Sequence, residues 1–254
     1  VAGSMGPLLA TYRPDLMPDV GLASEQFAEM IALLGDRVDL LLAETVCSLQ
    51  EAEGIFQGYV ASGTDKPLWM AFSVDDEDGT KLRSGEPLFI VTQMMHHYKP
   101  AAVLLNCSLP ETITQGLPIL TDCGLPFGAY ANGFTKITDA FKQDAPTVDA
   151  LSARTDLTPE AYADQVMNWV SAGATIVGGC CEVGPAHIAE IARRLAEHPS
   201  RGREATSAQA FLIDQIVRLL HDFTIQYLYP SGNRSSGERL TLRGRRGQRP
   251  PGRP

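Results

Sequence analysis

Three cysteines stand where their thiols could act together. Cys180 and Cys181 directly follow the short apolar run 176–179, which is typical of a buried strand. A second run of this kind, 101–105, is followed by Asn106 and then Cys107. In an α/β barrel the carboxyl ends of all strands lie on one face, so we expect the three thiols at a common site. Three thiolates can bind Zn²⁺ and leave its fourth tetrahedral position open, as catalytic zinc requires.

The residue pattern leaves other roles open for these thiols. A cysteine is often a small buried hydrophobic residue, and the adjacent Cys180 and Cys181 could form a redox-active disulfide. Their spacing is not that of a CxxC-type zinc motif. Five cysteines in 254 residues do not indicate a disulfide framework, so we expect free or metal-bound thiols in a reducing cytoplasm.

The elements that would hold these thiols alternate along the chain. Apolar runs of strand length are each followed by a stretch of helical periodicity, which predicts a parallel sheet with helical crossovers. The expected strands are 1–5, 38–43, 68–74, 101–105, 126–131 and 174–177. The expected helices begin at Ser24, after a capping box of Ser48 and Glu51, at 87, at 110, after Thr158 and at Pro185.

This count gives about six βα units, whereas a closed TIM-type (β/α)8 barrel has eight. Because the chain begins within an expected strand, we predict an incomplete TIM-type barrel that lacks two N-terminal units. The predicted organisation is a barrel domain over 1–200, a helical extension over 201–229 and a disordered Arg/Gly/Pro-rich tail over 230–254. The acidic stretch 75–78 lacks EF-hand spacing and is expected to be a solvated turn.

Charge and hydropathy exclude several classes of partner. The net charge is −9, and residues 233–254 contribute seven Arg and one Glu, so the remaining chain carries about −15. An acidic body argues against nucleic-acid binding, and the basic tail lacks the interleaved aromatic residues of single-strand binders. The chain has no apolar run of the roughly 18 residues needed to span a membrane.

Several motifs resemble those of one enzyme family. Gly178-Gly179-Cys180-Cys181, followed by Gly184-Pro185-Ala186-His187-Ile188, is similar to the signature of the homocysteine S-methyltransferases. Asn106-Cys107-Ser108 resembles the upstream zinc-ligand motif of that family. The opening 1–7, Glu44-Thr45 and the stretch 169–173 are also similar and occur in the order of the family. The resemblance covers about residues 1–198.

The resemblance implies a zinc-dependent barrel enzyme that moves a methyl group from a sulfonium donor to the thiol of homocysteine, giving methionine. S-methylmethionine and S-adenosylmethionine are the sulfonium donors that it implies, betaine is also used in the family, and the sequence does not predict which donor this chain uses. The matching zinc ligands are Cys107, Cys180 and Cys181. Glu44 would bind the amino group of the substrate, although a carboxylate at a helix entry is the ordinary alternative. Thr45 would line the same pocket, and Asn132 would do so from a Tyr-Ala-Asn sequence where the family often has Tyr-Pro-Asn.

One departure from the family concerns the start of the chain. The Asp-Gly motif of the family's first strand has no match here, so we expect either a fragment of a longer protein or a defective copy. Two alternative functions follow: a related thiol or selenol methyltransferase with another acceptor, and a non-catalytic zinc-binding remnant of the fold. The sequence does not predict an oligomeric state.

Overall fold

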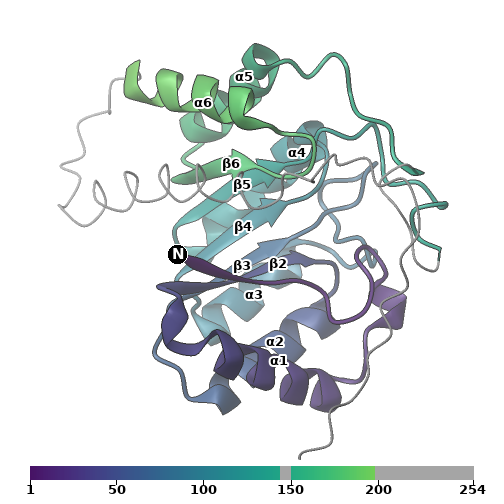
Figure 1. Ribbon diagram of the computed structural model, residues 1–254, viewed down its shortest axis with the longest axis vertical. Coiled ribbons are helices and arrows are strands. Elements are labelled where there is room, and N and C mark those ends of the chain that lie inside the picture. The colour runs from purple at the N-terminus through teal and green to yellow at the C-terminus, as the bar shows by residue number, and fades with distance from the viewer. Residues whose placement is uncertain (144–149, 198–254) are drawn as a thin grey trace, which may run out of the picture.

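The computed structural model describes residues 1–143 and 150–197 (Figure 1). The predicted extension 201–229 and tail 230–254 lie outside these residues. The six strands are β1 (Ala2–Met5), β2 (Leu40–Val46), β3 (Leu68–Phe72), β4 (Ala102–Asn106), β5 (Phe127–Ala131) and β6 (Ile176–Gly179). The α-helices are α1 (Val20–Leu34), α2 (Leu49–Ser62), α3 (Phe89–Tyr98), α4 (Pro110–Leu120), α5 (Pro159–Ser171) and α6 (Pro185–Glu197). Short 3₁₀ helices cover Pro14–Leu16, Gly35–Arg37 and Thr121–Cys123.

The strands form one parallel sheet in chain order, β1-β2-β3-β4-β5-β6 (Figure 1). Parallel neighbours need a crossover, and an α-helix lies in every connection from β1 to β6. Consecutive, parallel neighbours are the topology of a (β/α) barrel. The prediction of an incomplete TIM-type barrel with six βα units is therefore confirmed. Among the described helices, none is both long and apolar enough to cross a membrane.

The two faces of the sheet belong to different apolar clusters, because successive strand residues point to opposite sides. The outer face, with residues such as Leu41 and Phe72, shares a cluster with helix residues such as Phe27 and Ile55. The inner face carries a separate cluster built from strand residues, namely Leu40, Trp69, Ala71, Ala102, Leu104 and Ile176. The helices thus pack on the outer face of the sheet.

Helix starts follow local capping chemistry. Thr158 caps α5 by accepting a hydrogen bond from Ala161 N at 3.3 Å, with Pro159 at the first helical position, as predicted. The predicted start of α1 at Ser24 is wrong. Asp19 is the N-cap instead, because its carboxylate accepts a hydrogen bond from Leu22 N at 3.1 Å and so begins the helix at Val20.

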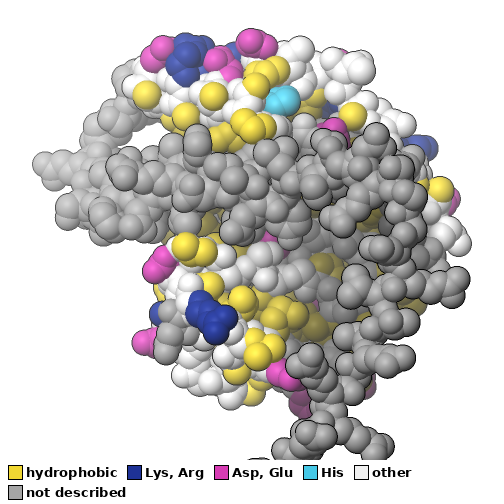
Figure 2. Space-filling model, viewed as in Figure 1, with side chains coloured by type: hydrophobic (Ala, Val, Ile, Leu, Met, Phe, Trp, Pro, Cys, Tyr) yellow, Lys and Arg dark blue, Asp and Glu magenta, His cyan; other side chains and the backbone are white. Residues whose placement is uncertain are grey.

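The outer surface of α6 shows the solvent side of the helical layer. Arg193 forms ion pairs with Glu190 and Glu197, and Arg194 forms ion pairs with Glu190 and Asp164. Figure 2 shows acidic and basic side chains together at this end of the molecule. The Arg193–Glu197 pair is exposed on both sides, and exposed ion pairs contribute little to stability.

We expect Gly58→Ala to destabilise the fold, because α1 and α2 meet at this glycine. A Cβ there would lie 2.7 Å from Ser24 O and 2.8 Å from Phe27 Cβ. The resulting overpacking is expected to lower the free energy of unfolding by about 1–3 kcal/mol in a denaturant titration. Gly6→Ala is the control, since a Cβ at Gly6 meets nothing within 4 Å. A gain of about 1 kcal/mol, the helix-propensity effect alone, would contradict close packing here.

Candidate metal centre

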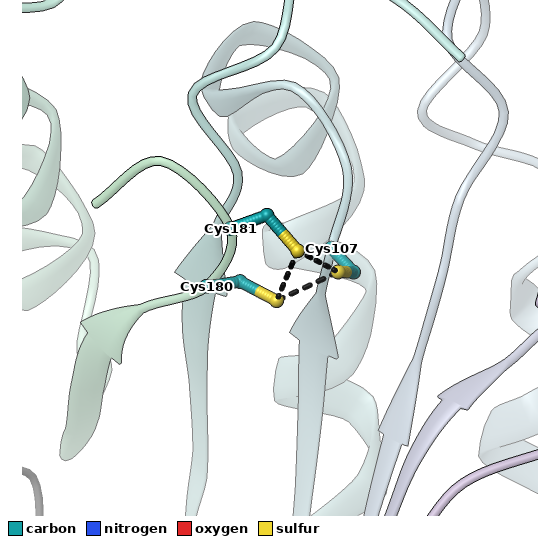
Figure 3. Close-up of side chains that lie close together, drawn as sticks. All are labelled: Cys107, Cys180 and Cys181. Carbon is teal, nitrogen blue, oxygen red and sulfur yellow. Dashed lines mark hydrogen bonds between the residues drawn. The ribbon is translucent and has the colours of Figure 1, made fainter. Parts of the chain in front are cut away.

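The three predicted thiols meet at the carboxyl ends of two strands (Figure 3). Cys107 follows β4, and Cys180 and Cys181 follow β6, so β5 lies between the two contributions. The Sγ of Cys107 is 2.6 Å from that of Cys180 and 3.9 Å from that of Cys181. The Sγ atoms of Cys180 and Cys181 are also 3.9 Å apart. All three cysteines are free, so the structure contains no disulfide between the adjacent pair.

These residues fit a zinc ion. A tetrahedral site with Zn–S bonds of about 2.3 Å places its sulfur atoms about 3.8 Å apart, which two of the three separations match. The third pair is closer, as two thiols in direct contact. Sulfur ligands favour Zn²⁺ over hard cations such as Mg²⁺ and Ca²⁺. Cys107 is buried, Cys180 half-buried and Cys181 exposed, so the cluster can be reached from solvent on one side.

The interactions within the cluster favour one thiolate and disfavour ionisation of the other two thiols. Hydrogen bonds from Cys180 and Cys181 hold the pKa of Cys107 well below its usual range, although burial opposes this. The hydrogen bond to Cys107 raises the pKa of Cys180 well above its usual range. The same partner raises the pKa of Cys181 to about 12. Three thiolates at this distance therefore need a nearby cation, because like charges disfavour one another.

The backbone at Cys107 is held in a strained conformation by buried polar contacts. Cys107 has φ 50°, and Thr45, on β2, two strands away from β4, has φ 62°. Thr45 N donates to Asn106 Oδ1 at 3.1 Å, and Asn106 Nδ2 donates back to Thr45 Oγ1 at 3.2 Å. Ser73 Oγ donates to Asn106 O at 2.9 Å. Such strain persists where the surroundings fix it and is typical of functional sites. The sequence signal that could have revealed this role is a buried Asn at the end of an apolar strand.

A loop cluster that the sequence analysis missed lies beside Cys107. The Tyr12 hydroxyl donates to Cys107 O at 3.4 Å, and the Arg83 guanidinium lies 4.5 Å from the centre of the Tyr12 ring. Arg83 also forms an ion pair with Asp76 at 2.7 Å, and Asp76 accepts a hydrogen bond from Ile137 N at 2.8 Å. The acidic stretch 75–78 is therefore not simply a solvated turn. Asp76 connects two loops at the site, because the fold brings Arg83 and Ile137 to its two oxygens.

Glu44 lies at the same end of the sheet as the thiols. The Tyr130 hydroxyl donates to Glu44 Oε2 at 3.0 Å, and the Ser4 hydroxyl donates to Oε1. Burial raises the pKa of Glu44, while the two hydroxyl donors lower it. The carboxylate is thus held from β1 and β5 in a fixed orientation. Thr45, next to it, is buried and bonded to Asn106.

Asn132 lies between the two strands that supply the thiols. Its backbone N–H donates to Ser108 O at 3.1 Å, and the next residue, Gly133, donates to Cys181 O at 2.8 Å. The Asn132 side chain accepts from Phe134 N at 3.2 Å, which orients the amide. Its Nδ2 is buried and has no partner in the described part of the chain. A buried donor of this kind commonly has a ligand or water as its partner.

Ala131, in the Tyr-Ala-Asn sequence, uses its backbone N–H in a contact with α5. Ala131 N donates to the Tyr162 hydroxyl at 3.0 Å, and that hydroxyl donates to Gly178 O at 2.7 Å. A proline has no backbone N–H and could not make the first contact. Here Tyr162 joins β5 to β6 just before the paired thiols.

The capping box predicted at the start of α2 forms in only one of its two hydrogen bonds. The Ser48 side chain accepts from Glu51 N at 3.1 Å, as predicted, but the Glu51 carboxylate accepts from Cys47 N at 2.8 Å rather than from Ser48. Burial raises the pKa of Glu51 from an ordinary 4.5 to about 7. A buried carboxylate of this kind links stability to pH.

We expect the fold to lose stability as pH rises from 5 to 8, because ionised Glu51 is disfavoured when folded. The folded pKa lies above the unfolded one, so the neutral form favours folding below about pH 4.5 and this benefit is lost through pH 7. The loss should be about 2–3 kcal/mol. Glu51→Gln should flatten the pH dependence in denaturant titrations, whereas Glu29→Gln, on the exposed side of α1, should not. Equal slopes in the wild type and Glu51→Gln would contradict this.

Comparison with known proteins identifies the family. The family model of the homocysteine S-methyltransferases matches residues 1–195. A homocysteine S-methyltransferase of Escherichia coli is 30% identical over 207 residues, which are 76% of this chain and 62% of that protein. Homocysteine S-methyltransferase 4 of Zea mays is 28% identical over 169 residues, covering 65% of this chain and 46% of its own. The metallated form of the E. coli homocysteine methyltransferase MmuM superposes with a TM-score of 0.57 at 27% identity, over 76% of this chain and 60% of its own.

A shorter match covers a different kind of protein. A bifunctional uridylyltransferase/uridylyl-removing enzyme of Novosphingobium aromaticivorans is 39% identical over 90 residues, which are 35% of this chain but 10% of that protein. The chain spans at most 62% of the length of these relatives. Its strand order, its thiol cluster and the family match over residues 1–195 agree with one another. The chain belongs to the homocysteine S-methyltransferase family.

Proposed function

We propose that this chain binds zinc through Cys107, Cys180 and Cys181 and transfers a methyl group from a sulfonium donor to the thiol of homocysteine. The observation that carries this proposal is the convergence of three free thiols, whose sulfur atoms lie within 4.8 Å of one another, at the carboxyl ends of β4 and β6. Membership of the homocysteine S-methyltransferase family supports the reaction class. Zinc held by the three thiolates would supply positive charge and an open fourth position, and a thiol that coordinates zinc is deprotonated at neutral pH.

The other residues of the site would bind and orient the acceptor. The Glu44 carboxylate would accept hydrogen bonds from the amino group of homocysteine, with Tyr130 and Ser4 holding its orientation. Asn132 Nδ2 would donate to a polar atom of the substrate, since it is buried without a partner in the described residues. Thr45 would form part of the pocket wall beside Glu44. Two reactants held in this way gain mainly from proximity.

A sulfonium donor suits the surroundings of the thiols. Tyr12, Phe134 and Phe141 share an apolar cluster with Cys107 and Cys180, and aromatic faces attract cations. In the transfer, the bond between the donor sulfur and its methyl carbon breaks and its electron pair stays on that sulfur. The acceptor thiolate forms the new carbon–sulfur bond. The donor leaves as a neutral thioether, so no general acid is needed, and S-methylmethionine or S-adenosylmethionine would serve. Free thiols in this role would require a reducing compartment such as the cytoplasm.

Metal analysis and a methyl-transfer assay test this proposal together. The purified full chain, loaded with zinc, should bind about one zinc per chain and convert homocysteine with labelled S-methylmethionine or S-adenosylmethionine to labelled methionine. Competition with selenol and other thiol acceptors would show whether homocysteine is preferred. Zinc binding without any methyl transfer would favour the non-catalytic alternative, and a folded chain that binds no zinc would overturn the proposal.

A further inference from the structure

His187, on the first turn of α6, joins two segments that lie far apart in the sequence. Its Nδ1 lies 3.1 Å from Gly184 N, and its Nε2 lies 3.0 Å from Leu157 O. Gly184 belongs to the turn that follows Cys181, and Leu157 precedes the N-cap of α5. One imidazole ring therefore ties the turn after the thiols to the start of the neighbouring helix.

These two contacts define the protonation state of the ring. Gly184 N–H is a donor, so Nδ1 must be unprotonated to accept from it. The Leu157 carbonyl is an acceptor, so Nε2 must carry the proton. Neutral imidazole with its proton on Nε2 satisfies both contacts. A charged ring would direct an Nδ1–H bond at the Gly184 N–H, and the contact that holds the turn would become repulsive.

The turn held in this way carries two of the three thiols. Cys180 N donates to Ala131 O at 2.9 Å, and Val183 N donates to Cys180 O at 3.1 Å. Within this turn Glu182 has φ 63°. A non-glycine residue at this φ is uncommon and needs support from its surroundings. The bond from Gly184 N to the imidazole supplies such support two residues after the strained Glu182.

Tyr162 holds the other side of the same turn. Its ring meets the His187 imidazole edge to face, with the ring centres 5.9 Å apart. Its hydroxyl donates to Gly178 O at 2.7 Å, just before the thiols. Contacts to Gly178 and Gly184 therefore enclose Cys180 and Cys181 from both ends.

We propose that His187 is a positioning residue that, as neutral imidazole protonated on Nε2, fixes the Cys180–Cys181 turn in the geometry that binds metal. This inference rests on the metal site of the proposed function, but not on methyl transfer. Outer contacts that orient the ligands of a metal typically change its affinity about 10- to 100-fold when they are lost. His187 acts here through the backbone of the turn and not as a ligand.

The charged groups around His187 leave the ring without an ion pair in the described part of the chain. On α6, Glu190 is paired with Arg193 and Arg194. Asp156, next to Leu157, is paired with Arg154. Tyr162 faces the ring from α5, and its hydroxyl is bonded to Gly178 O. In the described residues no ion pair joins His187 to a carboxylate, and both of its ring nitrogens face backbone groups instead.

Metal affinity and the state of the ring together test this proposal on the full chain. Zinc affinity from chelator competition should fall about tenfold or more in His187→Ala. His187→Asn keeps an acceptor where Nδ1 lies and should recover part of the loss. His96→Ala, an exposed histidine on α3, should not change the affinity. In ¹⁵N-histidine NMR spectra of the wild-type chain, His187 should be neutral at pH 7 with its proton on Nε2.

Two results would overturn the proposal: wild-type zinc affinity in a folded His187→Ala chain, or an imidazole that is charged or protonated on Nδ1 at pH 7. If His187→Ala does not fold, His187→Asn and the NMR spectra of the wild type still decide the question. A chain that passes these tests yet transfers no methyl group would contradict the proposed function alone.

Discussion

Cys107→Ser is expected to abolish stoichiometric zinc binding by the full chain. Cys107 is the buried member of the cluster, and its pKa is held well below its usual range by hydrogen bonds from Cys180 and Cys181. It is therefore the thiol that is most readily available as a thiolate, the form that binds metal. A serine hydroxyl stays protonated and is a poor ligand for zinc. The affinity should fall by more than the roughly 10- to 100-fold that loss of an outer contact causes, measured by chelator competition.

Cys123→Ser provides the matched control for this loss. Cys123 is also a free, buried cysteine, but it packs in the outer apolar cluster, and burial raises its pKa to about 11. This variant should bind one zinc with wild-type affinity, even if it is somewhat less stable. If Cys107→Ser kept one tightly bound zinc while remaining folded, the three-thiol site would be wrong.

Glu44→Gln is expected to reduce kcat/KM for homocysteine by about 10- to 100-fold, because a hydrogen bond between charged groups contributes about 1.5–3 kcal/mol. The amide retains an oxygen that can accept from Tyr130 or Ser4, so the pocket should keep its shape. Zinc affinity should not change. Most of the effect should appear in KM if Glu44 binds the amino group in the ground state and the transition state alike.

A comparison with an acceptor thiol that has no amino group distinguishes loss of the contact between Glu44 and the amino group from a general loss of activity. The wild type should prefer homocysteine to such an acceptor, and Glu44→Gln should lose most of that preference. Glu25→Gln, on the exposed side of α1, should behave as the wild type. An unchanged preference in Glu44→Gln would show that Glu44 does not contact the amino group.

The hydrophobic pattern of the sequence was sufficient to predict the parallel sheet and the proximity of the three cysteines. Continuous apolar runs alternating with helical periodicity predicted parallel strands, and the carboxyl ends of parallel strands meet on one side. That rule placed Cys107 near Cys180 and Cys181, which lie 73 and 74 positions further along the chain, and the structure brings their sulfur atoms together. Helix starts were less certain, because Asp19 and Ser24 are both acceptable caps and the choice depends on which backbone N–H each side chain reaches.

The contacts around the site could not be predicted from the pattern. Asp76 reads as one acid in a polar loop, yet it bonds Arg83 and Ile137 N. Asn106 reads as the last residue of a strand, yet it holds Thr45 at a positive φ. These partners lie 7 to 61 positions apart, and their pairing depends on loop conformations that have no periodicity.

By itself, the sequence determined the order of strands and helices, the strand ends on which the thiols lie, and the family whose motifs they share. These properties follow from hydrophobic periodicity and from residue types at fixed positions. Only the tertiary structure decided how the thiols are held. Asn106, which precedes Cys107, bonds to Thr45; Tyr162 bonds to Gly178, and His187 bonds to Gly184, on either side of Cys180 and Cys181. The physical reason is that a hydrogen bond requires two groups within about 3 Å in a suitable orientation, and only the folded chain sets that distance.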